Sequence, residues 1–365
     1  MDPLDNHQVI LRDAVRTWAD KRFRPADVHR TVESGRRHDP EAWQELARMG
    51  LPGLLIAEQD GGAGYFPMEL GLVFAEFGRT LASTPLLATV LAGRAISVHG
   101  TATDRITYLP RIAAGSTIAA LAHLDEPGDS RPAATAVPTA GAFTLHGSKA
   151  FVVDGVVADL FVVTALTDDG PSLFTVWADS AGVSRERLDG LDLTRTLATV
   201  TFDHVPATLV GKAGTAPSAI SPVLDLAAAL LAKEQVGGAR ACLDMAVRYA
   251  QDRVQFGRPI GAFQAVKHKC AEMLVAVESA AAAAQHALQC HAAGAPDVSA
   301  ASSLAKAFCS DAFAQVAADN IQIHGGIGFT WEHPAHLYLR RAKSSRLLFG
   351  TPMAHRAKLA ELLGV

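Results

Sequence analysis

The chain has 365 residues, 49% hydrophobic and 19% charged, a composition typical of a globular protein with room for two or three domains. Its 33 Lys and Arg against 37 Asp and Glu give a net charge of −4, so we expect no nucleic-acid partner. No apolar run approaches the roughly 20 residues of a membrane span, and the segment after Met1 lacks the features of a signal peptide. These patterns predict a cytoplasmic protein without a membrane span.

The four cysteines show no CxxC spacing, which argues against a zinc site or a disulfide framework. They stand at Cys242, Cys270, Cys290 and Cys309. We expect buried thiols and no bound metal.

The first third of the chain, residues 1–115, predicts a helical domain. Apolar residues recur every three or four positions from Asp5 to about Ile112, as in Trp43, Leu46 and Met49. The glycine-rich run at 61–64 interrupts this pattern and predicts a loop.

Residues 116–215 predict a β-domain. Short β-branched and aromatic runs cover 143–147, 160–164, 173–177 and 198–202. Turn-type residues at 168–171 and 203–206 separate these runs, so we expect turns there. Strands at this spacing predict an antiparallel sheet or barrel.

Residues 216–365 return to a helical period in longer segments, at 224–252, 263–293 and 300–323. Alanine is abundant here; it is the best helix former and lets helices pack closely. The predicted fold class is therefore α+β: a helical domain, an antiparallel β-domain and a C-terminal four-helix bundle.

Two segments have compositions suited to binding. The first runs from Arg253 to Gln264 and places two arginines and a glutamine around a turn that opens a helix. Such a turn suits a phosphate or pyrophosphate, although solvated arginines on a surface turn give the same pattern. The second runs from Gln322 to Thr330 and contains three glycines that would let another molecule approach the backbone. Alone, it also fits a helix C-cap followed by a loop.

Together these segments resemble the acyl-CoA dehydrogenase family. The stretch 322–343 can be laid on the family pattern without a gap. The stretches 43–51 with 61–64, and 147–155 with 158–159, are similar to signatures of the family's first and middle domains. The resemblance covers nearly the whole chain and implies FAD bound between domains and across a dimer.

The resemblance implies that a carboxylate removes the α-proton of an acyl-CoA thioester while the flavin takes the β-hydride. Phe151 then replaces the tryptophan that packs on the isoalloxazine, and Val153 replaces a threonine near flavin N5. The remaining expected FAD contacts are Arg253 and Phe256, which would reach the cofactor of the neighbouring subunit, with Gln322, Gly325, Gly326 and Thr351. An electron-transfer flavoprotein is the implied electron acceptor, in a homo- or hetero-oligomer.

Both positions at which the family carries its base hold residues that accept no proton. Phe349 stands where most members have a glutamate, and Ala227 stands where the others have one. Ala228 also replaces an arginine that helps to hold CoA. Glu234 lies about 10 Å further along the predicted helix, and we expect it to pair with Lys233 or Arg240. The catalytic residue is therefore unknown, and the flavin loop at 125–130 is shortened as well.

Three interpretations follow from this pattern. The chain is an active dehydrogenase with an unrecognised base. Alternatively it is a partner subunit that completes the FAD interface of a glutamate-bearing homologue, as in actinobacterial members that form mixed tetramers. The third interpretation is a flavin monooxygenase on the same fold.

Overall fold

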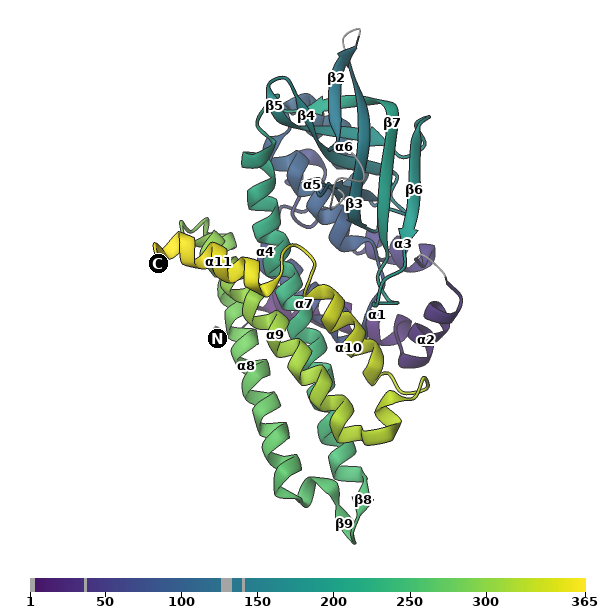
Figure 1. The fold of residues 1–365 in the computed structure, drawn as a ribbon, viewed down its shortest axis with the longest axis vertical. Helices are drawn as coiled ribbons and strands as arrows, with labels where there is room; N and C mark the ends of the chain where they lie inside the picture. The colour runs from purple at the N-terminus through teal and green to yellow at the C-terminus, as the bar shows by residue number, and fades with distance from the viewer. Residues whose placement is uncertain (1–3, 36–37, 126–132, 140–141) are drawn as a thin grey trace.

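The computed structural model describes residues 4–35, 38–125, 133–139 and 142–365. The molecule is elongated (Figure 1), with a β-domain at one end and long helices extending to the other. The expected order of helical region, β-domain and helical bundle is confirmed.

The N-terminal region consists of helices, as predicted. They are α1 (Asn6–Arg22), α2 (Pro25–Glu33), α3 (Pro40–Arg48), α4 (Pro67–Thr80), α5 (Leu86–His99) and α6 (Ala102–Ala113), with 3-10 turns η1 (Leu51–Gly53) and η2 (Glu58–Asp60). Helix α1 begins with a capping box, because the Asp5 carboxylate accepts from the Gln8 backbone N–H at 2.8 Å. Helices α2, α3 and α4 each begin with proline, whose fixed φ suits the first helical position.

Among the described residues, the β-domain contains seven strands. They are β1 (Ala119–Ala122), β2 (Thr135–Thr139), β3 (Ala142–Val153), β4 (Leu160–Thr167), β5 (Gly170–Trp177), β6 (Val183–Leu188) and β7 (Leu197–Val210). Strands β4, β2, β3, β7 and β5 pair in that order, and β5 pairs again with β4, so the sheet closes on itself. Most pairs are antiparallel, as predicted, but β1–β4 and β2–β4 are parallel.

The turn predicted at 203–206 is wrong, because these residues lie inside β7. The pairing of Leu145 with Val205 is followed by that of Gly147 with Phe202, so β7 has one residue more than β3 in this interval. This is a β-bulge, in which turn-type residues are accommodated without ending the strand.

The C-terminal region is a bundle of long helices. They are α7 (Ala216–Asp252), α8 (Gln264–Ala293) and α9 (Val298–His324), followed by η4 (Gly325–Phe329), α10 (Ala335–Ser345) and α11 (Pro352–Leu363). The hairpin β8 (Val254–Gln255) and β9 (Arg258–Pro259), with η3 (Ile260–Ala262), joins α7 to α8. The three predicted long helices are confirmed in position and order.

Helix α7 packs closely against α4. A Cβ at Gly78 would lie 1.8 Å from the Glu234 carbonyl oxygen, and one at Gly237 would lie 1.9 Å from the Ala75 carbonyl oxygen. Glycine is therefore required on both helices, and this contact joins the bundle to the N-terminal helices.

One described helix, Ala216–Asp252, is long and apolar enough to cross a membrane, and 72% of its most apolar window is buried inside the protein. All four cysteines are free, and three of them are buried, in agreement with the expected thiols.

Candidate functional site

Strand β3 turns Phe151 outward at a second bulge. Lys149 pairs with Val200 and Val152 with Ala198, so β3 has the extra residue here. Phe151 adopts a φ of 52° and leaves its ring 45% exposed, whereas Val153 is buried. An aromatic face held outward by a strained backbone suits a planar ring system.

An ion pair joins a buried lysine of β3 to a half-exposed carboxylate just after β1. The Lys149 ammonium is 2.6 Å from the Asp125 carboxylate and 3.2 Å from the Thr164 hydroxyl. Asp125 is the first residue of the flavin loop at 125–130 and the only residue of that loop that the structure describes. The rest of that loop, residues 126–130, lies outside the described residues.

The hairpin β8–β9 presents Arg253 and Phe256 to solvent. Phe256 and Gly257 have φ values of 53° and 76°, the pattern of a type I′ turn. The Phe256 side chain is 91% exposed, and Arg253 has no side-chain hydrogen bond or ion pair with any described residue. Arg258 instead lies over the Phe263 ring, 4.2 Å from its centroid.

The glycine segment lies at the same end of the bundle as this hairpin. The Tyr249 and His324 rings stack with centroids 4.3 Å apart and so link the end of α7 to the end of α9. Gln322 is exposed, and a Cβ at Gly325 or Gly326 would meet nothing within 4 Å. The backbone is open at these two glycines, whereas the third glycine of the segment, Gly328, is buried against Ile321 and His324.

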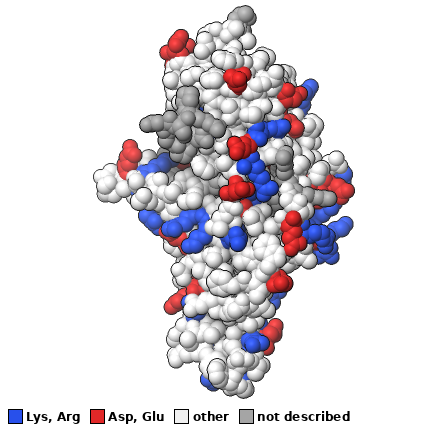
Figure 2. All heavy atoms as spheres, turned by 45° about the vertical axis from the view of Figure 1, so that its right-hand side comes forward, with Lys and Arg blue, Asp and Glu red and all other residues white. Residues whose placement is uncertain are grey.

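The predicted FAD residues therefore form two groups in one chain. Phe151 and Val153 lie on β3 in the β-domain, with Thr351 at the start of α11, whereas the hairpin and the glycine segment lie at the far end of the bundle (Figure 1). One cofactor can contact both groups only if two chains associate. On the face that Figure 2 shows, Lys, Arg, Asp and Glu side chains are sparse at the lower end of the molecule.

An aromatic stack occupies the position at which the sequence led us to expect the base. Phe349 packs between the core of the helices and the core of the β-domain, and it lies 6.3 Å from the His123 ring. Burial, assisted by the Lys149 charge, lowers the pKa of His123 to about 4. The second base position, Ala227, is 0% exposed within the same helical core.

Two polar side chains that the sequence analysis did not select hold the Phe349 segment. The Lys306 ammonium donates to the carbonyls of Gly350 (3.1 Å) and Arg346 (3.3 Å). His355 donates through Nε2 to the Phe349 carbonyl at 2.9 Å. Burial lowers the pKa of Lys306 to about 7. The signal for this role was a lysine within an apolar helix.

Glu234 is a paired carboxylate, but its predicted partners were wrong. It accepts hydrogen bonds from Arg195 (2.6 Å) and Arg341 (2.7 Å), and Arg341 also contacts Asp192 at 2.6 Å. Lys233 donates instead to Gln285. Burial opposes the charged form of Glu234, but the two guanidinium groups outweigh it and lower the pKa. Glu234 is thus committed to an internal network.

Asp154 is a second buried carboxyl group next to the predicted flavin strand. It directly follows Val153 and accepts a hydrogen bond from the Thr196 hydroxyl at 2.9 Å. Burial raises the pKa of Asp154 to about 6, although Thr196 and the nearby arginines act in the opposite direction. No motif in the sequence marked Asp154 as a site residue.

Comparison with known proteins identifies the family to which this fold belongs. The profile of the "Acyl-CoA dehydrogenase, N-terminal domain" family matches residues 5–116, and that of the "Acyl-CoA dehydrogenase, C-terminal domain" family matches residues 218–364. Acyl-CoA dehydrogenase IpdE2 of Mycolicibacterium smegmatis is 34% identical over 98% of both chains. The chain belongs to the acyl-CoA dehydrogenase family. It is thus a member of an oxidoreductase family whose activity is the FAD-dependent α,β-dehydrogenation of acyl-CoA thioesters.

Two solved structures from the same family are similar over nearly their whole length. A variant of the Tcur3481–Tcur3483 steroid acyl-CoA dehydrogenase is 33% identical with a TM-score of 0.88 and 98% coverage of each chain. The ChsE4–ChsE5 complex from Mycobacterium tuberculosis is 26% identical with a TM-score of 0.91, covering 100% of this chain and 99% of that one. Such neighbours support assembly into oligomers.

The described residues fit a flavin dinucleotide. An outward aromatic ring, an unpaired guanidinium and an open glycine backbone are the features that a ring system, a diphosphate and an adenosine need. Val153 departs from this fit in one respect, because its side chain donates no hydrogen bond to the flavin.

Proposed function

We propose that this chain is the base-deficient subunit of a mixed acyl-CoA dehydrogenase, in which a homologous subunit supplies the carboxylate. The observation that carries this proposal is the contact of Phe349 with His123 at the principal base position, together with Ala227 at the other. Within the part of the chain that the structure describes, Glu234 is held by two arginines and does not replace the missing base.

When bound, FAD would accept the hydride from the acyl-CoA. Phe151 would pack on its ring system, while Thr351 would contact it from the start of α11. The far end of the bundle would serve the cofactor of the neighbouring subunit. There Arg253 would hold the diphosphate, with Phe256, Gln322, Gly325 and Gly326 along the adenosine.

The names of two solved relatives support a mixed assembly. One is a complex of ChsE4 with ChsE5, and the other is a steroid acyl-CoA dehydrogenase named for both Tcur3481 and Tcur3483. The same division of roles would explain why this chain keeps the open backbone at Gly325 and Gly326 while lacking a base.

Co-expression tests the proposal. The chain is purified alone and together with a glutamate-bearing homologue, and the flavin absorption is followed as acyl-CoA is added without oxygen. We expect bleaching only in the mixed complex. Bleaching by the chain alone would contradict the proposal, and NADH-driven oxygen consumption would indicate the monooxygenase instead.

One observation favours the alternative of a self-sufficient dehydrogenase. The pKa of Asp154, raised to about 6 by burial, lies in the range of a general base. Its side chain is nevertheless buried and hydrogen-bonded to Thr196. If Asp154 is the base, the chain alone reduces its flavin and the Asp154→Asn variant does not.

A further inference from the structure

The bulge between β3 and β7 gathers three potential metal ligands on one face. His146 on β3 stands opposite two residues of β7, Asp203 and His204, between the pairs Leu145–Val205 and Gly147–Phe202. In regular strands, successive side chains alternate between faces, so Asp203 and His204 would point apart. His204 instead adopts a φ of 52°, and this left-handed backbone brings its ring to the side of Asp203.

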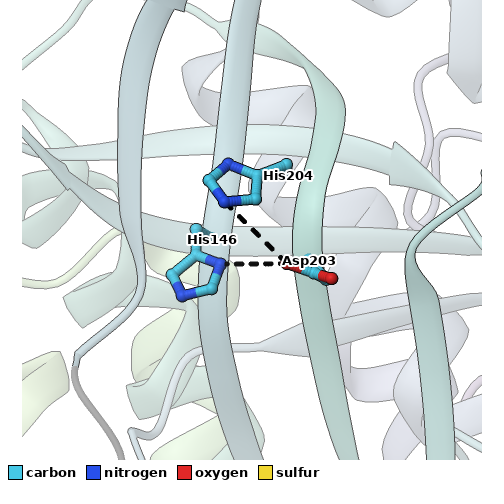
Figure 3. A group of neighbouring side chains, drawn as sticks. All are labelled: His146, Asp203 and His204. Carbon is cyan, nitrogen blue, oxygen red and sulfur yellow. Dashed lines mark ion pairs between the residues drawn. The ribbon is translucent and has the colours of Figure 1, made fainter.

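The three side chains converge on one point (Figure 3). Asp203 Oδ1 lies 3.5 Å from His146 Nδ1 and 3.9 Å from His204 Nε2. One ligand atom from each residue lies within 4.8 Å of the other two. The two imidazole rings are stacked, with centroids 4.8 Å apart, and both present a nitrogen to the same carboxylate.

These separations are close to those around a tetrahedral metal ion. Metal–ligand bonds of about 2.0–2.1 Å at tetrahedral angles place neighbouring ligand atoms about 3.3 Å apart. The observed distances of 3.5 and 3.9 Å exceed this by a few tenths of an ångström. The third separation, between the His146 and His204 nitrogens, is within 4.8 Å, and because all three side chains are exposed, their rings can rotate to close the triangle.

We propose that His146, Asp203 and His204 bind a divalent transition-metal ion of the Zn²⁺ and Cu²⁺ class. Two imidazole nitrogens and one carboxylate oxygen match the preference of these ions, whereas Mg²⁺ and Ca²⁺ take oxygen ligands. The ligands come from neighbouring strands on an exposed face, so water fills the remaining coordination positions. This site is separate from the flavin residues and departs from the expectation of no bound metal.

The Asp203 backbone is fixed before any ion binds. Its N–H donates to the Gly182 carbonyl at 2.9 Å, and a Cβ at Gly182 would lie 2.3 Å from the Asp203 carbonyl oxygen. Because the backbone is already rigid, less conformational entropy is lost when the ligand side chains become ordered around a bound ion.

Titration of the intact chain with Cu²⁺, followed by electron paramagnetic resonance, tests this site. We expect one equivalent of Cu²⁺ with hyperfine coupling to two imidazole nitrogens. His146→Ala and His204→Asn should each weaken Cu²⁺ and Zn²⁺ binding by at least about tenfold, since even the outer partners of metal ligands contribute about 10–100-fold. Asparagine is chosen at His204 because it tolerates positive φ.

Two histidine variants serve as controls. His268→Ala removes an exposed imidazole on α8 outside any candidate group. His286→Ala disrupts the other candidate group, with Cys290 and Asp297. Both variants should keep the two-nitrogen signal. Unchanged affinity in His146→Ala and His204→Asn, loss of the signal in His286→Ala, or no binding in the wild type would overturn the proposal. Equal melting temperatures without metal establish that each variant is folded.

Discussion

The Phe349 ring is stacked on the His123 imidazole, with the two planes 19° apart. Phe349 also contacts the cores of both the helical and the β-domain. The position at which we expected the family's glutamate is therefore filled by a packed aromatic contact. Phe349 thus contributes to the packing between the two regions.

Replacing this ring with a carboxylate should create dehydrogenase activity. The test uses the proposed mixed complex, with the glutamate of the homologous subunit changed to glutamine. There, Phe349→Glu should raise the rate of anaerobic flavin reduction by acyl-CoA at least about 100-fold, the usual contribution of a general base. Stopped-flow absorption measures this rate.

The matched control is Phe349→Gln, which has the same size but accepts no proton. It should remain at the background rate. If Phe349→Glu retains its flavin and is equally inactive, the position does not face the substrate.

The Arg253 guanidinium should determine how firmly the assembly holds its flavin. Arg253→Ala removes a cation that has no partner among the described residues, and a charged hydrogen bond to phosphate contributes about 2 kcal/mol. We expect flavin affinity to fall by about 30-fold, measured as the flavin-to-protein ratio after dialysis. Lys267→Ala, an exposed cation near the start of α8, should leave that ratio unchanged. Equal flavin content in both variants would remove Arg253 from the site.

The sequence predicted the elements of this fold well, because helix period and strand alternation are local signals. Helices α8 and α9 begin and end close to the predicted residues, whereas α7 (Ala216–Asp252) ends as predicted but begins about two turns before residue 224. Asp203 and His204 show where local reasoning fails. Turn-type residues within a strand can form a bulge, and only the pairing with β3 distinguishes the two outcomes.

Candidate site residues could be selected from the sequence only where they belong to a recognisable motif. Arg253 and Gly325 were selected from their segments and both are exposed, whereas the partners of Glu234 were not predicted. Arg195 comes from the β-domain and Arg341 from α10, at sequence separations of 39 and 107 residues. Such contacts depend on tertiary packing, which the local pattern of a single sequence does not predict.

Removing the Asp154 charge should stabilise the protein near neutral pH. The folded-state pKa of about 6 lies above the usual 3.8, so ionisation of Asp154 destabilises the fold above pH 6 and has no effect below about pH 4. Asp154→Asn should therefore raise the free energy of unfolding by up to about 3 kcal/mol at pH 7.5. This gain should shrink as the pH falls from 6 to 4, which urea denaturation at several pH values measures.

Asp168→Asn, in the exposed turn between β4 and β5, is the control for this series. Its free energy of unfolding should stay within about 0.5 kcal/mol of wild type at each pH. A gain in Asp154→Asn that does not vary with pH would show that burial of charge is not its cause.

The guanidinium of Arg341 should be essential to stability. It is 1% exposed and contacts Asp192, Glu234 and Thr194. Arg341→Met keeps most of the side-chain length but removes the positive charge that pairs with the buried carboxylates of Asp192 and Glu234. We expect the free energy of unfolding to fall by about 3–5 kcal/mol. We expect a lower urea midpoint with an unchanged denaturant slope.

The pH dependence separates this electrostatic cause from a packing defect. The arginines lower the pKa of Glu234, so without Arg341 that pKa rises and Glu234 takes up a proton in the folded state more readily. The destabilisation in Arg341→Met should therefore be smaller at pH 4 than at pH 7, because protonation removes the uncompensated charge. Arg340→Met, the same change one residue earlier on a half-buried side chain, should have little effect at either pH. An equal loss in Arg341→Met at both pH values would indicate that packing, and not charge pairing, is what Arg341 provides.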